Sequence, residues 1–288
     1  FLRDVAEMLD NVLQYFIDNA PSAVSRSIHS ARSERSIGIG ALGFHAYLQK
    51  NNMPWESAMA VGRNKQMFSH IRGQLDVANL ELGKERGEAP DAVGTGKRFS
   101  HMVAIAPNAS SSIIMGNTSP SIEPYRANAY RQDTLSGAYL NKNKYLDAII
   151  QKHAEIHPEG WADEVWSSII ANDGSVQHLE WLGDWEREVF KTGMEIDQRW
   201  VVQHAADRQE YIDQAQSLNV FFRPDVNVKY LHAVHFQAWK QGLKTMYYCR
   251  SEKLAKADKV SKKIERHVIE EIDIKQLASE EVCLACEG

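Results

Sequence analysis

Cysteine is scarce in this chain of 288 residues, which contains only Cys249, Cys283 and Cys286. Three cysteines are too few for a disulfide scaffold, so we expect a protein of a reducing, cytoplasmic compartment. Long apolar runs are also lacking, because no window approaches the roughly 18 consecutive apolar residues of a membrane helix, and no signal peptide opens the chain. A net charge of −5 gives no support for a general nucleic-acid surface. We therefore expect neither a membrane nor a nucleic acid as a partner.

An initiator methionine is lacking as well, since the chain opens at Phe1 inside what reads as an amphipathic helix. We therefore expect a piece of a longer protein. The remaining composition is typical of a globular protein, with 43% hydrophobic and 25% charged residues. The length is sufficient to bury a substantial core.

The most informative stretch is residues 101–124, HMVAIAPNASSSIIMGNTSPSIEP. Its apolar residues 102–106 predict a short buried strand that ends at Pro107. Small polar residues follow, and apolar residues resume at Ile113, as they do where a helix begins. Free backbone N–H groups and hydroxyls at such a turn can hold a phosphate. A serine-rich cap without any ligand fits the same local pattern, and both interpretations stay open at this point.

The rest of the chain reads as helices with a few short strands. Apolar periodicity predicts helices over residues 5–17, 54–82, 139–153, 207–217 and 228–241. A further buried strand is predicted at residues 218–222 and another strand at residues 243–249, in which the adjacent tyrosines would point to opposite faces. The tryptophans between residues 159 and 204 are interpreted as packing between helices.

Two patterns that suggest ligands have simpler explanations. Gly38, Gly40 and Gly43 have the spacing G-x-G-x-x-G, but no clear strand precedes them, so close backbone packing is favoured over a dinucleotide site. His232 and His235 lie three residues apart on a predicted helix, as metal ligands can. No third ligand is grouped with them, so no metal site is predicted on this chain.

The C-terminal segment differs in character from the rest. It holds no Phe, Trp or Tyr after Ser251 and is dominated by Lys, Glu, Asp and Ala, so we expect residues 251–288 to form a flexible tail. The tail ends in a C-x-x-C pair, Cys283 and Cys286, which can close a disulfide or supply half a zinc site. Because no second cysteine pair is present, a reversible dithiol on a tether is favoured, with inert cysteines as the alternative.

A serine-rich turn, a Tyr-Tyr pair and a terminal cysteine pair follow one another in an order that resembles the large (α) subunit of class I ribonucleotide reductase. PNASSSIIMGNTSPSIEP resembles the substrate-phosphate motif of that family, and GLKTMYY resembles the strand that bears its radical-relay tyrosines. RSIGIGALGFHAYL and GEAPDAVGTGKR also resemble family segments. The resemblance covers essentially the whole chain and corresponds to the C-terminal part of that subunit.

The resemblance implies an α/β fold. Residues 1–250 would be the C-terminal part of a ten-stranded α/β barrel with many surrounding helices, and residues 251–288 the flexible tail with its redox cysteine pair. A half barrel exposes a strand edge, which favours pairing with the missing N-terminal part of the large subunit.

The resemblance also implies roles for particular residues. The diphosphate of a ribonucleoside diphosphate substrate would be held by Pro107, Asn108, Ala109, Ser110 and Ser111. Tyr247 and Tyr248 would transfer a radical from the small (β) subunit toward the active site. Cys283 and Cys286 would re-reduce the active-site disulfide and be reduced in turn by thioredoxin or glutaredoxin. The radical or dinuclear metal cofactor is expected on the small subunit, nucleotide effectors on the N-terminal part, and no cofactor on this chain.

One departure from the family limits what this chain can do alone. The family carries its radical cysteine in an Asn-x-Cys-x-Glu loop, together with two further active-site cysteines, and none of that set is present here. Cys249 follows Tyr248 directly and is interpreted as a strand or edge residue. We therefore predict reduction of ribonucleoside diphosphates only when the N-terminal part and the small subunit complete the enzyme. The alternative is a non-catalytic interaction module derived from the reductase, which binds the small subunit or a redox partner; a free-standing thiol–disulfide protein fits less well.

Overall fold

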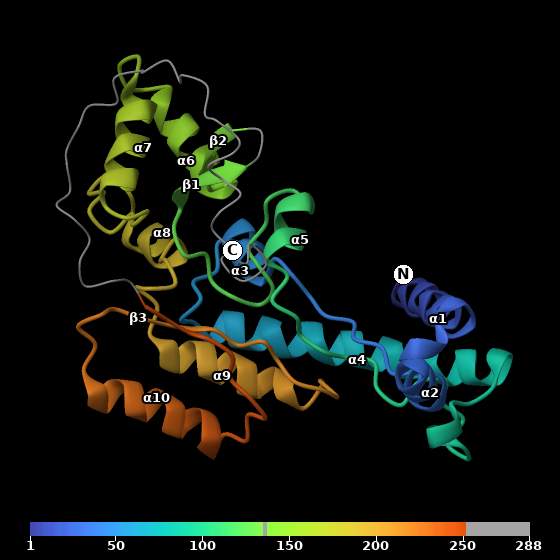
Figure 1. Cartoon of the computed structure of the whole chain (residues 1–288). Helices are drawn as coiled ribbons and strands as arrows, with labels where there is room; N and C mark the ends of the chain where they lie inside the picture. Colours follow the sequence, from blue (N-terminus) through green and yellow to red (C-terminus); the bar gives the residue numbers. More distant parts are fainter. Residues whose placement is uncertain (135–136, 252–288) are drawn as a thin grey trace.

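The computed structural model describes residues 1–134 and 137–251, and about half of them are helical (Figure 1). The N-terminal part contains α1 (Leu2–Asn19), α2 (Ser25–Glu34), α3 (Phe44–Lys50) and α4 (Ala58–Arg86), with 3-10 turns at Ser22–Val24 and Pro90–Ala92. The central part contains α5 (Ala109–Ile114), β1 (Ala129–Thr134), β2 (Gly137–Lys142), α6 (Lys144–Ala154), α7 (Trp161–Ala171) and α8 (Asp184–Val189). The C-terminal part contains α9 (Gln198–Gln209), β3 (Val220–Phe222), α10 (Val228–Lys240) and β4 (Cys249–Ser251).

Four extended segments run parallel to one another at the centre of the fold. Ile39 pairs with Val103, and Ile105 pairs in turn with Gln216. Beyond these bridges, β3 pairs in parallel with β4. The order across the array is therefore residues 37–39, 101–105, 214–222 and 247–251. Every connection between neighbouring segments contains at least one helix, as parallel strands require. This arrangement is part of an α/β barrel, and the fold class predicted from the sequence is confirmed.

In the segment predicted as a strand at residues 102–106, Met102, Val103 and Ile105 are buried, but Ala106 is exposed and the segment pairs only through two isolated bridges. Its first two amides are used elsewhere. The carboxylate of Asp213 accepts hydrogen bonds from the backbone N–H groups of Met102, at 2.8 Å, and Val103, at 3.0 Å. A side chain thus takes the place of a strand neighbour, which is why a continuous strand does not form.

Three predicted helices are confirmed with small changes of boundary. The first two are α1 and α10. Helix α10 ends shortly before Gly242, whose φ of +76° only glycine adopts without strain. The long helix α4 begins at Ala58 because Ser57 caps it, accepting a hydrogen bond from the N–H of Ala60 at 3.1 Å.

Two other helix predictions are wrong in part. The helix predicted over residues 139–153 begins only at Lys144, after the hairpin strand β2, because Asn143 caps it through the N–H groups of Tyr145 and Leu146. Of the helix predicted over residues 207–217, only residues 207–209 are helical, as the end of α9, which stops at Gln209. Residues 214–217 instead bond to the segment around Ile105, whose carbonyl accepts from the N–H of Ser217 at 2.8 Å.

Close backbone packing explains the glycine motif, as predicted. A Cβ atom on Gly40 would lie 2.5 Å from the carbonyl oxygen of Ala104, so only glycine allows the first two parallel segments to approach. Gly43 has a φ of +81°, and a Cβ there would lie 2.6 Å from Oγ1 of Thr118. Both glycines therefore serve the packing of the chain on itself.

The core consists of a main cluster around the parallel segments and two smaller ones. The main cluster joins α1, α3, α4 and α9 to residues such as Val103 and Ile105. A second cluster lies among α6, α7 and α8, and a third lies between α9, α10 and β3. Helix packing by tryptophan is confirmed for Trp161, Trp166, Trp181 and Trp200, whereas Trp185 is 45% exposed. Among the described helices, none has the combined length and apolar character of a membrane span.

Candidate active site

The serine-rich stretch turns into a helix, as the sequence predicts. Asn108 adopts a left-handed conformation with a φ of 54° immediately before α5, which is only six residues long. Ser110 and Ser111 are exposed in the first turn, whereas Ser112 is buried and bonds to the carbonyl of Ala109 at 2.6 Å. The amides of a first turn have no partner within their helix. Two accessible hydroxyls and these amides thus lie together at one end of α5.

The loop that follows α5 is fixed to the N-terminus of α3. Backbone oxygens of Ser119 and Ser121 accept from the N–H groups of Gly43 and Phe44, at 2.9 and 3.3 Å. Farther along, the N–H of Tyr125 donates to Nδ1 of His45 at 2.8 Å. Burial lowers the pKa of His45 to about 3, so its ring is neutral and can accept that bond. The segment between the serines and β1 therefore has a defined course.

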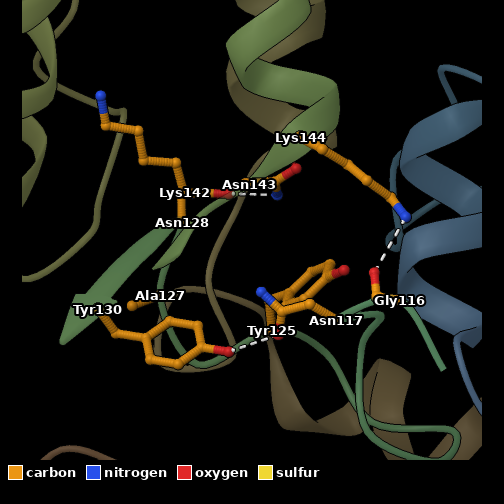
Figure 2. Close-up of a pocket in the computed structure, with 9 residues that line it drawn as sticks. All are labelled: Gly116, Asn117, Tyr125, Ala127, Asn128, Tyr130, Lys142, Asn143 and Lys144. Atoms are coloured by element: carbon orange, nitrogen blue, oxygen red, sulfur yellow. Dashed lines mark hydrogen bonds between the residues drawn. The ribbon is translucent and has the colours of Figure 1, made fainter. Parts of the chain in front are cut away.

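A cavity of about 130 Å³ lies at the other end of α5 (Figure 2). Its polar wall groups are largely bonded to one another. The hydroxyl of Tyr130 donates to Oδ1 of Asn117 at 3.1 Å, and Nζ of Lys144 donates to the carbonyl of Gly116 at 3.4 Å. None of the residues predicted to bind phosphate lines this cavity. The cavity and the serine-rich turn are thus separate features.

The two tyrosines lie together, in a way that the sequence did not predict. β4 begins only at Cys249, so Tyr247 and Tyr248 precede it, and the strand predicted over residues 243–249 is wrong for most of its length. The predicted arrangement on opposite faces is also wrong, since the ring centroids are 4.2 Å apart with 55° between the planes. Backbone bonds hold the pair beside β3: the N–H of Tyr247 donates to Leu218 at 2.8 Å, and the carbonyl of Tyr248 accepts from Val220 at 3.0 Å.

A buried carboxyl connects the serine-rich motif to the tyrosine pair. Glu123 is 5% exposed and hydrogen-bonded to Asn219, whose Oδ1 accepts from the N–H of Tyr248 at 3.0 Å. Burial raises the pKa of Glu123 to about 7, although the bonds from Asn219 and the charge of Arg250 favour the ionised form. The guanidinium of Arg250 lies over the ring of Tyr248, 5.5 Å from its centroid.

Sequence reasoning missed this group of residues. Glu123 belongs to the quoted motif, and the available signal is a charged residue directly between Ile122 and Pro124. Its burial could not be read from the sequence, because Asn219 and Arg250 are about a hundred residues away along the chain.

The remaining candidate residues are placed as follows. Cys249 is exposed at the start of β4, which confirms the interpretation of an edge residue. Cys283 and Cys286 lie outside the described residues, so the boundary of the tail and its redox role stay predictions. His232 stacks near Phe236, and Nδ1 of His235 lies 2.8 Å from the carbonyl of Leu231. Within the described ranges, no three potential ligands from His, Cys, Asp and Glu are grouped.

Comparison with known proteins gives consistent findings. The family model for the barrel domain of ribonucleotide reductase matches residues 1–92 and 89–249. The ribonucleoside-diphosphate reductase large subunit of Invertebrate iridescent virus 6 is 54% identical over 95% of this chain and 28% of its own length. That of Invertebrate iridescent virus 3 is 55% identical over 100% of this chain and 44% of its own length. The solved structure of the class Id ribonucleotide reductase alpha subunit of Actinobacillus ureae is similar, with a TM-score of 0.80 and 38% identity, covering 87% of this chain and 46% of that one. The chain thus spans less than half the length of these relatives.

Proposed function

Because the chain belongs to the ribonucleotide reductase barrel-domain family, we propose that it is the C-terminal part of a ribonucleoside-diphosphate reductase large subunit. Completed by the N-terminal part and the small subunit, it takes part in the reduction of ribonucleoside diphosphates to deoxyribonucleoside diphosphates. The observation that carries this proposal is the tyrosine pair, with ring centroids 4.2 Å apart, in a chain 54–55% identical to named large subunits.

The serine-rich turn is the proposed binding site of the substrate diphosphate. The residues assigned to it are Pro107, Asn108, Ala109, Ser110 and Ser111. Exposed hydroxyls and unpaired amides at a helix start bind an anion without a lysine or arginine. The two exposed serines in the first turn support this assignment.

Replacing Ser110 and Ser111 together by alanine should raise the KM for a ribonucleoside diphosphate. A hydrogen bond lost to a charged ligand costs about 1.5–3 kcal/mol, so an increase in KM of about tenfold is expected if one of the two hydroxyls bonds to the diphosphate, and of about a hundredfold or more if both do. The measurement is steady-state reduction of cytidine diphosphate by the complete enzyme. Ser69→Ala, at an exposed serine on α4, is the matched control. An unchanged KM and rate in the double variant would contradict the phosphate assignment.

The tyrosine pair is proposed to relay the radical. The small subunit's radical or dinuclear metal cofactor supplies the oxidising equivalent when the subunits assemble. In each transfer the donor phenol loses one electron and its hydroxyl proton and becomes a neutral phenoxyl radical. The acceptor radical gains both and becomes a phenol again. Rings in contact, each half exposed, suit such short steps between a partner subunit and the barrel interior.

The terminal cysteine pair is proposed to return electrons after each turnover by thiol–disulfide exchange with the active-site disulfide. Changing Cys283 and Cys286 to serine should stop multiple turnovers with thioredoxin or glutaredoxin, while turnover with dithiothreitol partly survives. A small thiol reaches the active site directly and bypasses the tail. Cys249→Ser is the matched control, because Cys249 is exposed but precedes the tail. Equal losses with both reductants would argue against a shuttle.

The proposal as a whole is tested by co-expression of this chain with the N-terminal part and the small subunit, followed by an assay of cytidine diphosphate reduction. We expect turnover from the assembled proteins and none from any of them alone. A correctly assembled complex without turnover would favour the non-catalytic interaction module instead.

A further inference from the structure

The carboxyl of Glu123 is not used by any step described so far, although it lies close to the tyrosine pair. The side chain is only 5% exposed, and its Oε1 has no hydrogen-bond partner within the residues that the structure describes. Leaving a buried carboxyl oxygen unpaired is costly. Such a group calls for an explanation beyond packing.

The position of Glu123 is defined from two neighbouring parallel segments. Asn219, directly before β3, bonds to Glu123 through its side chain and backbone, and its Oδ1 also accepts a hydrogen bond from the N–H of Tyr248. Arg250, on β4, is the charged residue that acts on Glu123 within the described part of the chain. Asn219 therefore ties the carboxyl to the backbone of the tyrosine pair, and Arg250 lies over the ring of Tyr248 while its charge also acts on the carboxyl.

We propose that Glu123 is a positioning residue for radical transfer, whose carboxylate offsets the positive charge that Arg250 places on the ring of Tyr248. This inference rests on the proposed radical relay. A cation over an aromatic ring stabilises the electron-rich ring and opposes removal of an electron from it. A carboxylate close to that cation weakens its field at the ring.

The direction of the pH effect follows from the charge of Glu123. Burial is the main cause that raises its pKa to about 7. Below pH 7 the carboxyl is neutral, the charge of Arg250 is not offset, and oxidation of Tyr248 is slow. Above pH 7 the carboxylate offsets that charge, and oxidation is faster. Transfer through the pair therefore accelerates as the pH rises through about 7.

The test measures single-turnover nucleotide reduction against pH in the complete enzyme, with wild type, Glu123→Gln, Arg250→Gln and the double variant. Glutamine can still bond to Asn219 but carries no charge. We expect Glu123→Gln to lose the rise near pH 7 and to be about tenfold slower above it, the equivalent of about one pKa unit of interaction. The double variant should be faster than Glu123→Gln, because the charge that needed an offset is gone.

A merely structural role predicts a different result. If Glu123 only held Asn219 in place, Glu123→Gln would keep the rise near pH 7, and removing Arg250 as well would not restore the rate. Either outcome overturns the proposal.

A second measurement separates this inference from the proposed function. Flash oxidation of the complete large subunit by a soluble ruthenium(III) oxidant forms tyrosine radicals without the small subunit or turnover. The radical yield of Tyr248 is obtained by subtracting the yield of the Tyr248→Phe variant from that of wild type. The rate of Tyr248 radical formation should rise through pH 7 in wild type and stay constant in Glu123→Gln. Equal pH profiles in the two proteins would overturn the inference even where the relay itself is confirmed. If the profiles differ but Tyr248→Phe still reduces nucleotides, the relay fails while the electrostatic coupling stands.

Discussion

Replacing Tyr247 or Tyr248 by phenylalanine should abolish nucleotide reduction by the complete enzyme and leave substrate affinity intact. Phenylalanine keeps the ring that packs at 4.2 Å, so the local structure should survive. It has no hydroxyl hydrogen to give up, and a phenyl ring cannot become a neutral phenoxyl radical. The expected loss is therefore in turnover, and the binding of a ribonucleoside diphosphate, measured directly, should match that of wild type.

Tyr15→Phe provides the matched control for this experiment. Tyr15 lies on α1 and is 71% exposed, away from the parallel segments that hold the pair. Its replacement should leave turnover unchanged. Substantial turnover by either variant of the pair would refute the relay, whereas a loss of substrate binding would point to structural damage.

Replacing Asp10 by alanine should destabilise the chain strongly. Asp10 lies on α1, is 1% exposed, and accepts hydrogen bonds from three arginines of other elements. The distances are 2.6 Å from Nη2 of Arg35, 3.0 Å from Nη1 of Arg86 and 3.1 Å from Nε of Arg98. Arg35 is itself 4% exposed, so losing the carboxylate leaves a buried guanidinium without its counter-charge. Such losses cost about 3–5 kcal/mol.

The measurement is urea unfolding followed by tryptophan fluorescence. Asp4→Ala, on the same helix, is the matched control, because Asp4 is exposed and forms no ion pair with another element within the described residues. An exposed charge of that kind contributes about 0–1 kcal/mol. Equal effects of the two substitutions would show that the buried cluster contributes no special stability.

The same cluster sets the behaviour of the chain in acid. Burial opposes ionisation of Asp10, but the bonds from Arg35, Arg98 and Arg86 outweigh it and lower the pKa of Asp10 below its usual 3.8. The stabilisation is therefore present above about pH 4 and is lost as the pH falls through the lowered pKa. Asp10→Ala should remove this part of the acid sensitivity.

Long helices and the principal motifs could be predicted from the sequence, because their signals are local. The apolar face of α1, for example, recurs at helical spacing within the helix itself. Short strands and helix ends could not be predicted as well. The helix predicted over residues 207–217 fails because Asp213 caps the amides of Met102 and Val103, more than a hundred residues away.

The candidate site divides in the same way. By itself, the sequence determined the family of the chain, the serine-rich turn and the adjacent tyrosines, since each is a contiguous pattern. Only the tertiary structure decided that the rings of Tyr247 and Tyr248 are in contact and that the carboxyl of Glu123 is buried beside them. The contact between the two rings and the raised pKa of Glu123 both depend on which distant segments surround these residues. Here β3, β4 and the loop after α5 provide those surroundings.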